Sequence, residues 1–182
     1  MASVEIIGIA AISLDGFITR HEEEGTGFTS PEDGAFFRHA LGSFDCALMG
    51  RRTYEVSRAH ILASLSSGRL RVVRTHTPEA FAVDAQAGQL EFTSASLGQI
   101  LADLAARGKQ RCAVLGGTSL YSECLQRDQM DELWLTLEPL GFGSGKPLLK
   151  GRLQAQFQLK RVQALSPNTL LLQYRCLRGV SR

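Results

Sequence analysis

Short apolar runs alternate with amphipathic segments along most of the chain. The runs are bounded by glycine, proline or polar residues and lack helical spacing, which is typical of strands buried in a sheet. They cover residues 4–13, 46–49, 70–74, 90–93, 112–115 and 131–137. The first run, 4–13, is apolar and partly β-branched, and it is predicted to be a central strand covered on both faces.

Helices are predicted between these runs, where apolar residues recur three and four positions apart. Their starts are expected at Ser30, after Gly50, at Ser96, and at Thr118 or Ser119. The first start is the clearest, because Ser30 can act as the cap and is followed by Pro31 and two acidic residues. This first helix is expected to end near Ser43, and the last one near Leu125.

The last part of the chain has a different pattern. Residues 156–162 and 169–177 alternate like two antiparallel strands joined near Ser166-Pro167-Asn168, which predicts a hairpin. Strands that alternate with helices favour a mostly parallel sheet, so the chain is predicted to have an α/β fold with an antiparallel edge. With 182 residues, of which 44% are hydrophobic, residues 1–182 are expected to form a single domain.

Composition argues against several classes of partner. The net charge is only +2 and the basic residues are scattered, so nucleic acid is not the expected partner. The apolar run that ends at Leu14 is too short to span a bilayer, and no basic segment precedes it. A soluble, cytoplasmic protein without a membrane partner is therefore expected. The four cysteines lie far apart and predict neither a disulfide framework nor a metal site.

The most informative polar feature is a helix start with two arginines. Gly50 ends an apolar run, and Arg51 and Arg52 follow at once. The positive end of a helix disfavours guanidinium groups unless an anion binds beside them. Gly50 would let its backbone approach such an anion and Thr53 would add a hydroxyl, so we predict a phosphate site here. A solvated arginine pair is the alternative interpretation.

A similar arrangement recurs at Gly116-Gly117, where another apolar run leads directly into a helix. Two such turns can lie on the same carboxyl edge of a sheet, where ligands of open α/β folds bind. Together they predict a dinucleotide site, although the glycine spacing is not the G-x-G-x-x-G pattern of the Rossmann fold. A tight turn without a ligand is the alternative for the glycine pair.

Two aspartates are candidate substrate contacts. Asp33 lies in the first turn of the first helix and faces a long loop over residues 17–30, and the alternative is an acid placed there by the helix dipole. Asp15, just beyond the first strand, is either a turn residue or a ligand contact. The chain has no G-x-S-x-G motif and its histidines lack metal-ligand spacing, so hydrolases and metalloenzymes are disfavoured.

Several short segments occur in a characteristic order. They are Ser13-Leu14-Asp15-Gly16, Gly50-Arg51-Arg52-Thr53-Tyr54-Glu55, Leu115-Gly116-Gly117 with Leu120 and Leu125, and Asp131-Glu132-Leu133 before Pro139. Together they resemble the reductase domain of the riboflavin-biosynthesis deaminase-reductase, the RibD C-terminal family. That resemblance implies a dihydrofolate reductase-like fold with three α-β-α layers, an NADPH-dependent oxidoreductase activity and a homodimer.

The resemblance also implies roles for individual residues. NADPH would be bound by Ala11, Ser13, Gly50, Arg51, Arg52, Thr53, Thr75, His76, Leu115, Gly116, Gly117, Thr118, Ser119 and Leu120. Thr75 and His76 fall where this fold contacts the 2′-phosphate, which favours NADPH over NADH. Ala11 and Ser13 would lie near the nicotinamide. Asp15 and Asp33 would act in catalysis and substrate binding.

Other segments resemble dihydrofolate reductase itself. Asp33, with Phe37 one turn later, matches the helix that carries its pterin-binding carboxylate, and Thr136 matches its pterin-contacting threonine. The substrate site would then comprise Asp15, Asp33, Phe37 and Thr136. By contrast, the riboflavin enzymes carry a lysine, an arginine and a glutamate at three positions that are apolar here, namely Ile9, Leu41 and Leu115.

The predicted function is therefore the reduction of a small heterocyclic or sugar-derived substrate by hydride transfer from NADPH. The reaction would resemble that of 5-amino-6-(5-phosphoribosylamino)uracil reductase in riboflavin biosynthesis. The alternatives are a pterin reductase of the dihydrofolate reductase type and a non-catalytic nucleotide-binding module. The natural substrate stays open, because a ribityl-phosphate substrate would lose three polar contacts.

Overall fold

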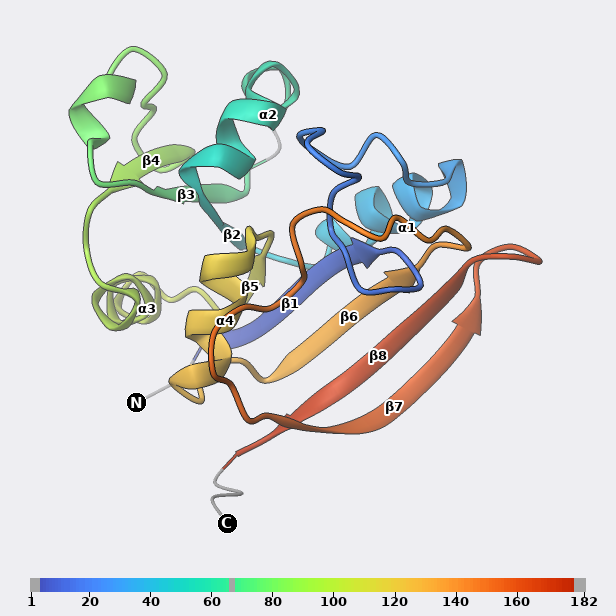
Figure 1. Cartoon of the computed structure of the whole chain (residues 1–182). Coiled ribbons are helices and arrows are strands. Elements are labelled where there is room, and N and C mark those ends of the chain that lie inside the picture. Colours follow the sequence, from blue (N-terminus) through green and yellow to red (C-terminus); the bar gives the residue numbers. More distant parts are fainter. Residues whose placement is uncertain (1–3, 66–67, 179–182) are drawn as a thin grey trace.

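The computed structural model describes residues 4–65 and 68–178, which build a single sheet with helices on both faces (Figure 1). Its strands are β1 (Glu5–Ile12), β2 (Cys46–Gly50), β3 (Leu70–Arg74), β4 (Leu90–Thr93), β5 (Arg111–Val114), β6 (Glu132–Leu137), β7 (Gln156–Ala164) and β8 (Leu170–Leu177). Their order across the eight-stranded sheet is β4-β3-β2-β5-β1-β6-β8-β7. The predicted α/β class is confirmed.

The direction of the strands also follows the prediction. From β4 to β6 all neighbouring strands are parallel, whereas β8 is antiparallel to β6 and β7 is antiparallel to β8. The predicted C-terminal hairpin is thus confirmed, with a bulge between Leu159 and Arg161. Because parallel strands point the same way, the carboxyl ends of β3, β2, β5, β1 and β6 lie along one rim of the sheet.

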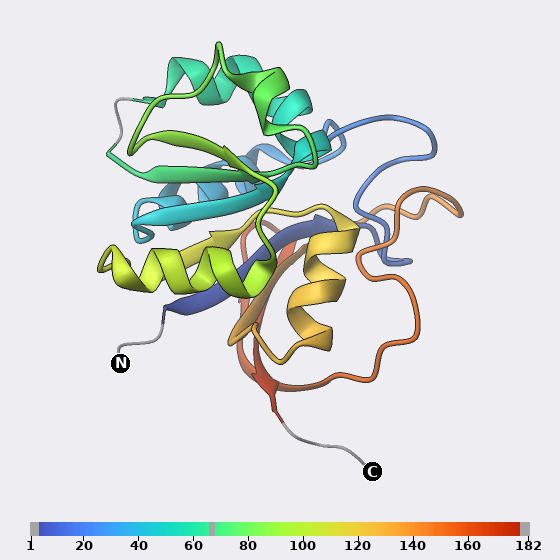
Figure 2. The same cartoon turned by 90° about the vertical axis from the view of Figure 1, so that its left-hand side faces the viewer.

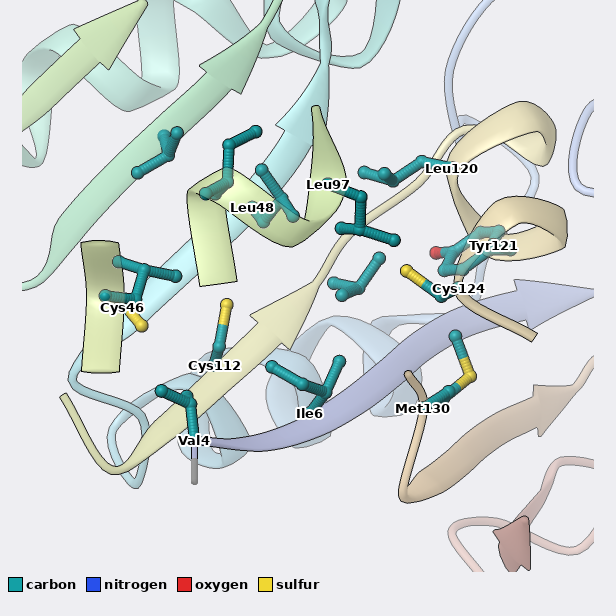
Figure 3. Close-up of a cluster of buried hydrophobic side chains, with 14 of the residues drawn as sticks. Val4, Ile6, Cys46, Leu48, Leu97, Cys112, Leu120, Tyr121, Cys124 and Met130 are labelled. Carbon is teal, nitrogen blue, oxygen red and sulfur yellow. The ribbon is translucent and has the colours of Figure 1, made fainter. Parts of the chain in front are cut away.

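Two helices cover each face of the sheet (Figures 1 and 2). Helices α1 (Pro31–Leu41) and α2 (Arg51–Ala63) pack over two apolar clusters on one face. Helices α3 (Leu97–Ala106) and α4 (Thr118–Gln126) pack over the largest cluster on the other face, where Cys46, Cys112 and Cys124 are buried (Figure 3). The predicted three layers are confirmed. Within residues 4–65 and 68–178, no helix is long and apolar enough to cross a membrane.

The segment from 78 to 88, which has no sequence period, contains one short 3-10 helix at Pro78–Phe81. The adjoining loop is held against α2 by Asp84. This carboxylate accepts hydrogen bonds from the Tyr54 hydroxyl at 2.6 Å and from Arg58 at 2.6 and 2.7 Å. An irregular segment is therefore fixed by side chains where it lacks a regular backbone ladder.

Helix starts are of two kinds. Ser30 and Ser96 cap α1 and α3 as predicted, with side chains that accept hydrogen bonds from the third helical N–H group. Helices α2 and α4 begin after Gly50 and Gly117, which offer no side-chain cap. The predicted cap at Thr118 or Ser119 is therefore wrong, because both residues already lie inside α4 and the extended residue before it is Gly117.

Candidate active site

The two glycine corners lie side by side on the carboxyl rim. Strands β2 and β5 are parallel neighbours, and their pairing continues beyond the strands. The Leu115 N–H group donates to the Leu48 carbonyl at 2.9 Å, and the Gly50 N–H group donates to the Gly116 carbonyl at 2.8 Å. Helix α2 then turns to one face of the sheet and α4 to the other. Such a divergence leaves a crevice between two helix N-termini, which is where open α/β sheets bind ligands.

The second corner requires glycine. Gly116 has a φ of +101°, and a Cβ atom there would lie 3.2 Å from the ring of Tyr121. The Gly116–Gly117 peptide bond is cis. Tyr121 in turn donates its hydroxyl to the Ile9 carbonyl of β1 at 2.6 Å, just past the last β1–β5 pair of Gly8 with Val114. The corner is therefore packed directly against the central strand, and Tyr121 lies in the core shown in Figure 3.

The first corner is electropositive. The first turn of α2 contains no acidic residue, and Arg51 and Arg52 are both exposed. Arg51 lies 3.6 Å from Glu55, whereas Arg52 has no ion pair within the described part of the chain. The Thr53 hydroxyl lies 3.8 Å from the position of a Cβ atom on Gly117, so it faces the second corner. Free helix N–H groups, guanidinium groups and a hydroxyl form a donor set that suits phosphate oxygens.

Other predicted cofactor residues follow in order along the rim. Thr75 and His76 come directly after β3, which is the neighbour of β2. Thr75 is buried, with its N–H group donating to the Thr93 carbonyl at 2.9 Å, while His76 is exposed. On the other side of β5, Ala11 is buried in β1 and Ser13 follows that strand. The structure therefore brings both groups to the same edge as the corners.

The side chains at the start of α4 point elsewhere. The Thr118 hydroxyl donates to the Pro147 carbonyl at 2.5 Å, and Leu120 is buried in the core. Ser119 lines a surface hollow on the outer side of α4 together with Lys150. Leu115 is half-buried and packs against the clusters beneath α1 and α2. These residues can therefore contribute backbone groups to a ligand more readily than side chains.

Asp15 joins two loops above the rim. It accepts hydrogen bonds from the Ser13 hydroxyl at 2.6 Å and from the N–H groups of Phe142 and Gly143 at 3.1 and 2.7 Å. The Ser13 hydroxyl, followed by the Gly143 N–H group, lowers the pKa of Asp15 to about 2. Because loop donors occupy both carboxylate oxygens, the geometry favours a loop-holding role for Asp15 over the predicted catalytic one.

Two of the predicted substrate residues, Asp33 and Thr136, lie together at the far end of the rim. Asp33 is buried in the first turn of α1. Thr136 is buried in β6 at the position that pairs with Ala11 of β1, and its hydroxyl opposes the rise in the pKa of Asp33. Phe37 is half-buried and packs on the sheet beside Phe44. Asp33 and Thr136 therefore lie next to the end of the central strand.

A second buried carboxylate in this region is missing from the sequence prediction. Glu138 is 2% exposed and accepts hydrogen bonds from the N–H and hydroxyl groups of Ser30, both at 2.8 Å, and from the Thr169 hydroxyl at 3.2 Å. Burial raises the pKa of Asp33, and the charge of Glu138 raises it further, while the Thr136 and Thr29 hydroxyls oppose the rise. The available signal was the position of Glu138, because it directly follows β6 on the carboxyl rim.

We expect Asp33→Asn to change the pH dependence of stability. The raised pKa means that the stabilising contribution of Asp33 is complete below the unfolded pKa of about 3.9 and is lost as pH rises through the folded value. The variant carries no such charge, so its melting temperature relative to wild type should increase with pH. Thermal melting from about pH 4 to about pH 8 measures this difference.

The matched control is Glu32→Gln, which removes an exposed acid from the same helical turn. This variant is expected to show no such increase. A difference in melting temperature between Asp33→Asn and wild type that stays constant across the pH range would contradict a raised pKa of Asp33.

The sheet order, the C-terminal hairpin and the paired glycine corners define a dihydrofolate reductase-like fold. More particularly, the RibD C-terminal domain family matches residues 5–171, so the chain belongs to that family. No functionally curated protein matches the sequence.

Solved structures agree with this assignment. The Thermotoga maritima diaminohydroxyphosphoribosylaminopyrimidine deaminase/5-amino-6-(5-phosphoribosylamino)uracil reductase is 18% identical with a TM-score of 0.78, over 96% of this chain and 57% of that one. Acinetobacter baumannii RibD is 15% identical with a TM-score of 0.77, over 97% and 59%. A pyrimidine reductase-like protein from Corynebacterium diphtheriae is 17% identical with a TM-score of 0.73, over 97% and 93%. At these identities the likeness establishes the fold alone.

Proposed function

We propose that this protein is an NADPH-dependent reductase that acts on a small heterocyclic substrate at the Asp33 end of the rim. The observation that carries the proposal is the pair of adjacent helix N-termini at Gly50 and Gly117, which lack side-chain caps and lie beside Arg51 and Arg52. NADPH fits this donor set because its pyrophosphate and 2′-phosphate are anions. Family membership and the reductase names of the related structures support the same class.

The proposed mechanism divides the work between the two ends of the rim. When bound, the reduced nicotinamide supplies two electrons and a hydrogen as hydride. Ala11 and Ser13, at the end of β1, would border the reacting ring. Asp33 would hold the proton that the substrate nitrogen or oxygen takes up as its double bond to carbon is reduced, and would regain a proton from water. The remaining contribution of the protein is positioning.

The substrate we favour is a heterocycle without a phosphorylated sugar. Ile9, Leu41 and Leu115 all pack into apolar clusters, so they offer no polar contact to a ribityl phosphate. The buried Asp33 and Thr136 suit the polar edge of a flat ring instead. An aminouracil and a pterin are therefore the first substrates to test. A non-catalytic nucleotide-binding module is the second candidate, favoured by the same three apolar positions.

Replacing both arginines, Arg51→Ala with Arg52→Ala, is expected to weaken NADPH binding by about 2 to 4 kcal/mol, or about 30- to 700-fold in Kd, because charge-assisted bonds are lost. NADH, which lacks the 2′-phosphate, should lose less. Calorimetric titration of both cofactors measures the difference. Arg152→Ala with Arg161→Ala is the matched control, since it makes the same charge change on exposed residues away from the rim. An unchanged NADPH affinity in the first variant would rule out the phosphate site.

Turnover distinguishes the reductase from the binding module. Wild-type protein with NADPH is expected to consume the cofactor with an aminouracil, dihydrofolate or a small carbonyl compound, followed by the nicotinamide absorbance. Asp33→Asn should lower kcat by about 100-fold or more, because the proton donor is removed. NADPH binding without consumption on the whole panel would favour the module. A melting temperature raised by NADPH and not by NADH checks cofactor choice independently.

We also propose that the protein forms a homodimer through the β7–β8 hairpin. The bulge keeps Leu159 and Val162 on one face, opposite Tyr174 and Leu172, and their exposed fractions are 50% and 51%. Grouped apolar side chains at a surface favour an interface. Light scattering after size exclusion should give the mass of a dimer for wild type and of a monomer for Val162→Asp. A monomeric wild-type protein would contradict this proposal.

A further inference from the structure

Asp33 and Glu138 are two buried acids connected through a single serine. The Ser30 hydroxyl donates to Glu138 Oε1 at 2.8 Å and accepts from the Asp33 N–H group at 3.2 Å. The Ser30 N–H group also donates to Glu138 Oε1, at 2.8 Å. Ser30 is the cap of α1, so a carboxylate just beyond β6 anchors the helix turn that carries Asp33.

No cation among residues 4–65 and 68–178 forms an ion pair with either of these two acids. The other groups that face Asp33 are neutral, namely the hydroxyls of Thr136 from β6 and Thr29 from the preceding loop. On α1 itself, Glu32 is exposed and the Arg38 guanidinium lies beside Gly34. Ionising both buried carboxyls without a cation is unfavourable, so one of them should retain a proton.

We propose that Glu138 is a positioning residue that keeps Asp33 in its protonated form at the substrate end of the rim. This inference rests on the proposed function and deepens it. Glu138 accepts three hydrogen bonds, from Ser30 and Thr169, a set that suits an ionised carboxylate. Asp33 is therefore the member of the pair that carries the proton, and the upward direction of its pKa agrees.

A protonated Asp33 narrows the class of substrate. A neutral carboxyl group donates one hydrogen bond, whereas a carboxylate only accepts. The site then matches a neutral heterocycle whose nitrogen or oxygen acceptor adjoins the carbon that receives hydride. As this C=N or C=O bond is reduced, its electron pair moves to the heteroatom, which takes the proton from Asp33. A cationic heterocycle that requires an ionised partner fits less well.

The test is an infrared titration of the free protein, without cofactor. The infrared band of Asp33 is the C=O stretch of a protonated carboxyl group that wild type shows and Asp33→Asn lacks. In wild type this band should persist above the pH range in which an ordinary aspartate loses its proton. Glu138→Gln keeps the acceptor for Ser30 and removes the charge, so the titration midpoint should move to lower pH. Ser30→Ala removes the bridging hydroxyl and keeps the charge of Glu138. Its titration midpoint should therefore differ less from that of wild type than the midpoint of Glu138→Gln does.

Kinetics give a second readout. The rate should fall as pH rises through the pKa of Asp33, and in Glu138→Gln this fall should begin at lower pH with the KM for NADPH unchanged. An identical midpoint in wild type and Glu138→Gln would overturn the proposal. If Glu138→Gln does not fold, the comparison of wild type with Asp33→Asn is the test. An Asp33 that titrates in the pH range of an ordinary aspartate would also overturn the proposal.

These outcomes separate the two proposals. A shifted infrared midpoint without NADPH consumption supports the carboxyl pair and overturns the reductase. NADPH consumption with an ordinary Asp33 titration supports the reductase and overturns the pair.

Discussion

The candidate site depends on the hydrogen bond from the Gly50 N–H group to the Gly116 carbonyl. It extends the β2–β5 ladder to the point where the two strands diverge, so that α2 leaves on one face of the sheet and α4 on the other. This hydrogen bond holds the N-termini of α2 and α4 next to each other. Neither glycine carries a side chain that would cap the following helix, and the free N–H groups remain available to an anion.

The rim that results is electrically asymmetric. Arg51 and Arg52 make the α2 end positive, whereas Asp33 and Glu138 make the far end acidic, and Tyr121 ties the intervening corner to β1. An elongated ligand with anionic and neutral ends would bind in only one direction along such a rim, because reversal would bring its phosphates to buried carboxyls. The opposite charges at the two ends of the rim can therefore orient a ligand without a residue that contacts the central part of the ligand.

Features of the fold that depend on neighbouring residues could be predicted from the sequence. Features that depend on contacts between residues far apart in the sequence could not. The Ser30 and Ser96 caps and the strands were readable because each depends on residues within one turn or one run. The α4 cap was not, because Thr118 and Gly117 are both acceptable caps in sequence and the backbone of the glycine corner decides between them.

The same limit explains the acidic residues. Asp15 stayed ambiguous because its partners Phe142 and Gly143 follow more than 120 residues later, and Glu138 was missed because Ser30 lies 108 residues away from it. Membership of the RibD C-terminal family does not remove this gap, since function belongs to the site and not to the fold. At Ile9, Leu41 and Leu115 this chain has apolar side chains that pack into the hydrophobic clusters. Under the proposed function, substrate recognition would come mainly from the polar groups on the rim, and those buried at its far end include Asp33, Thr136 and Glu138.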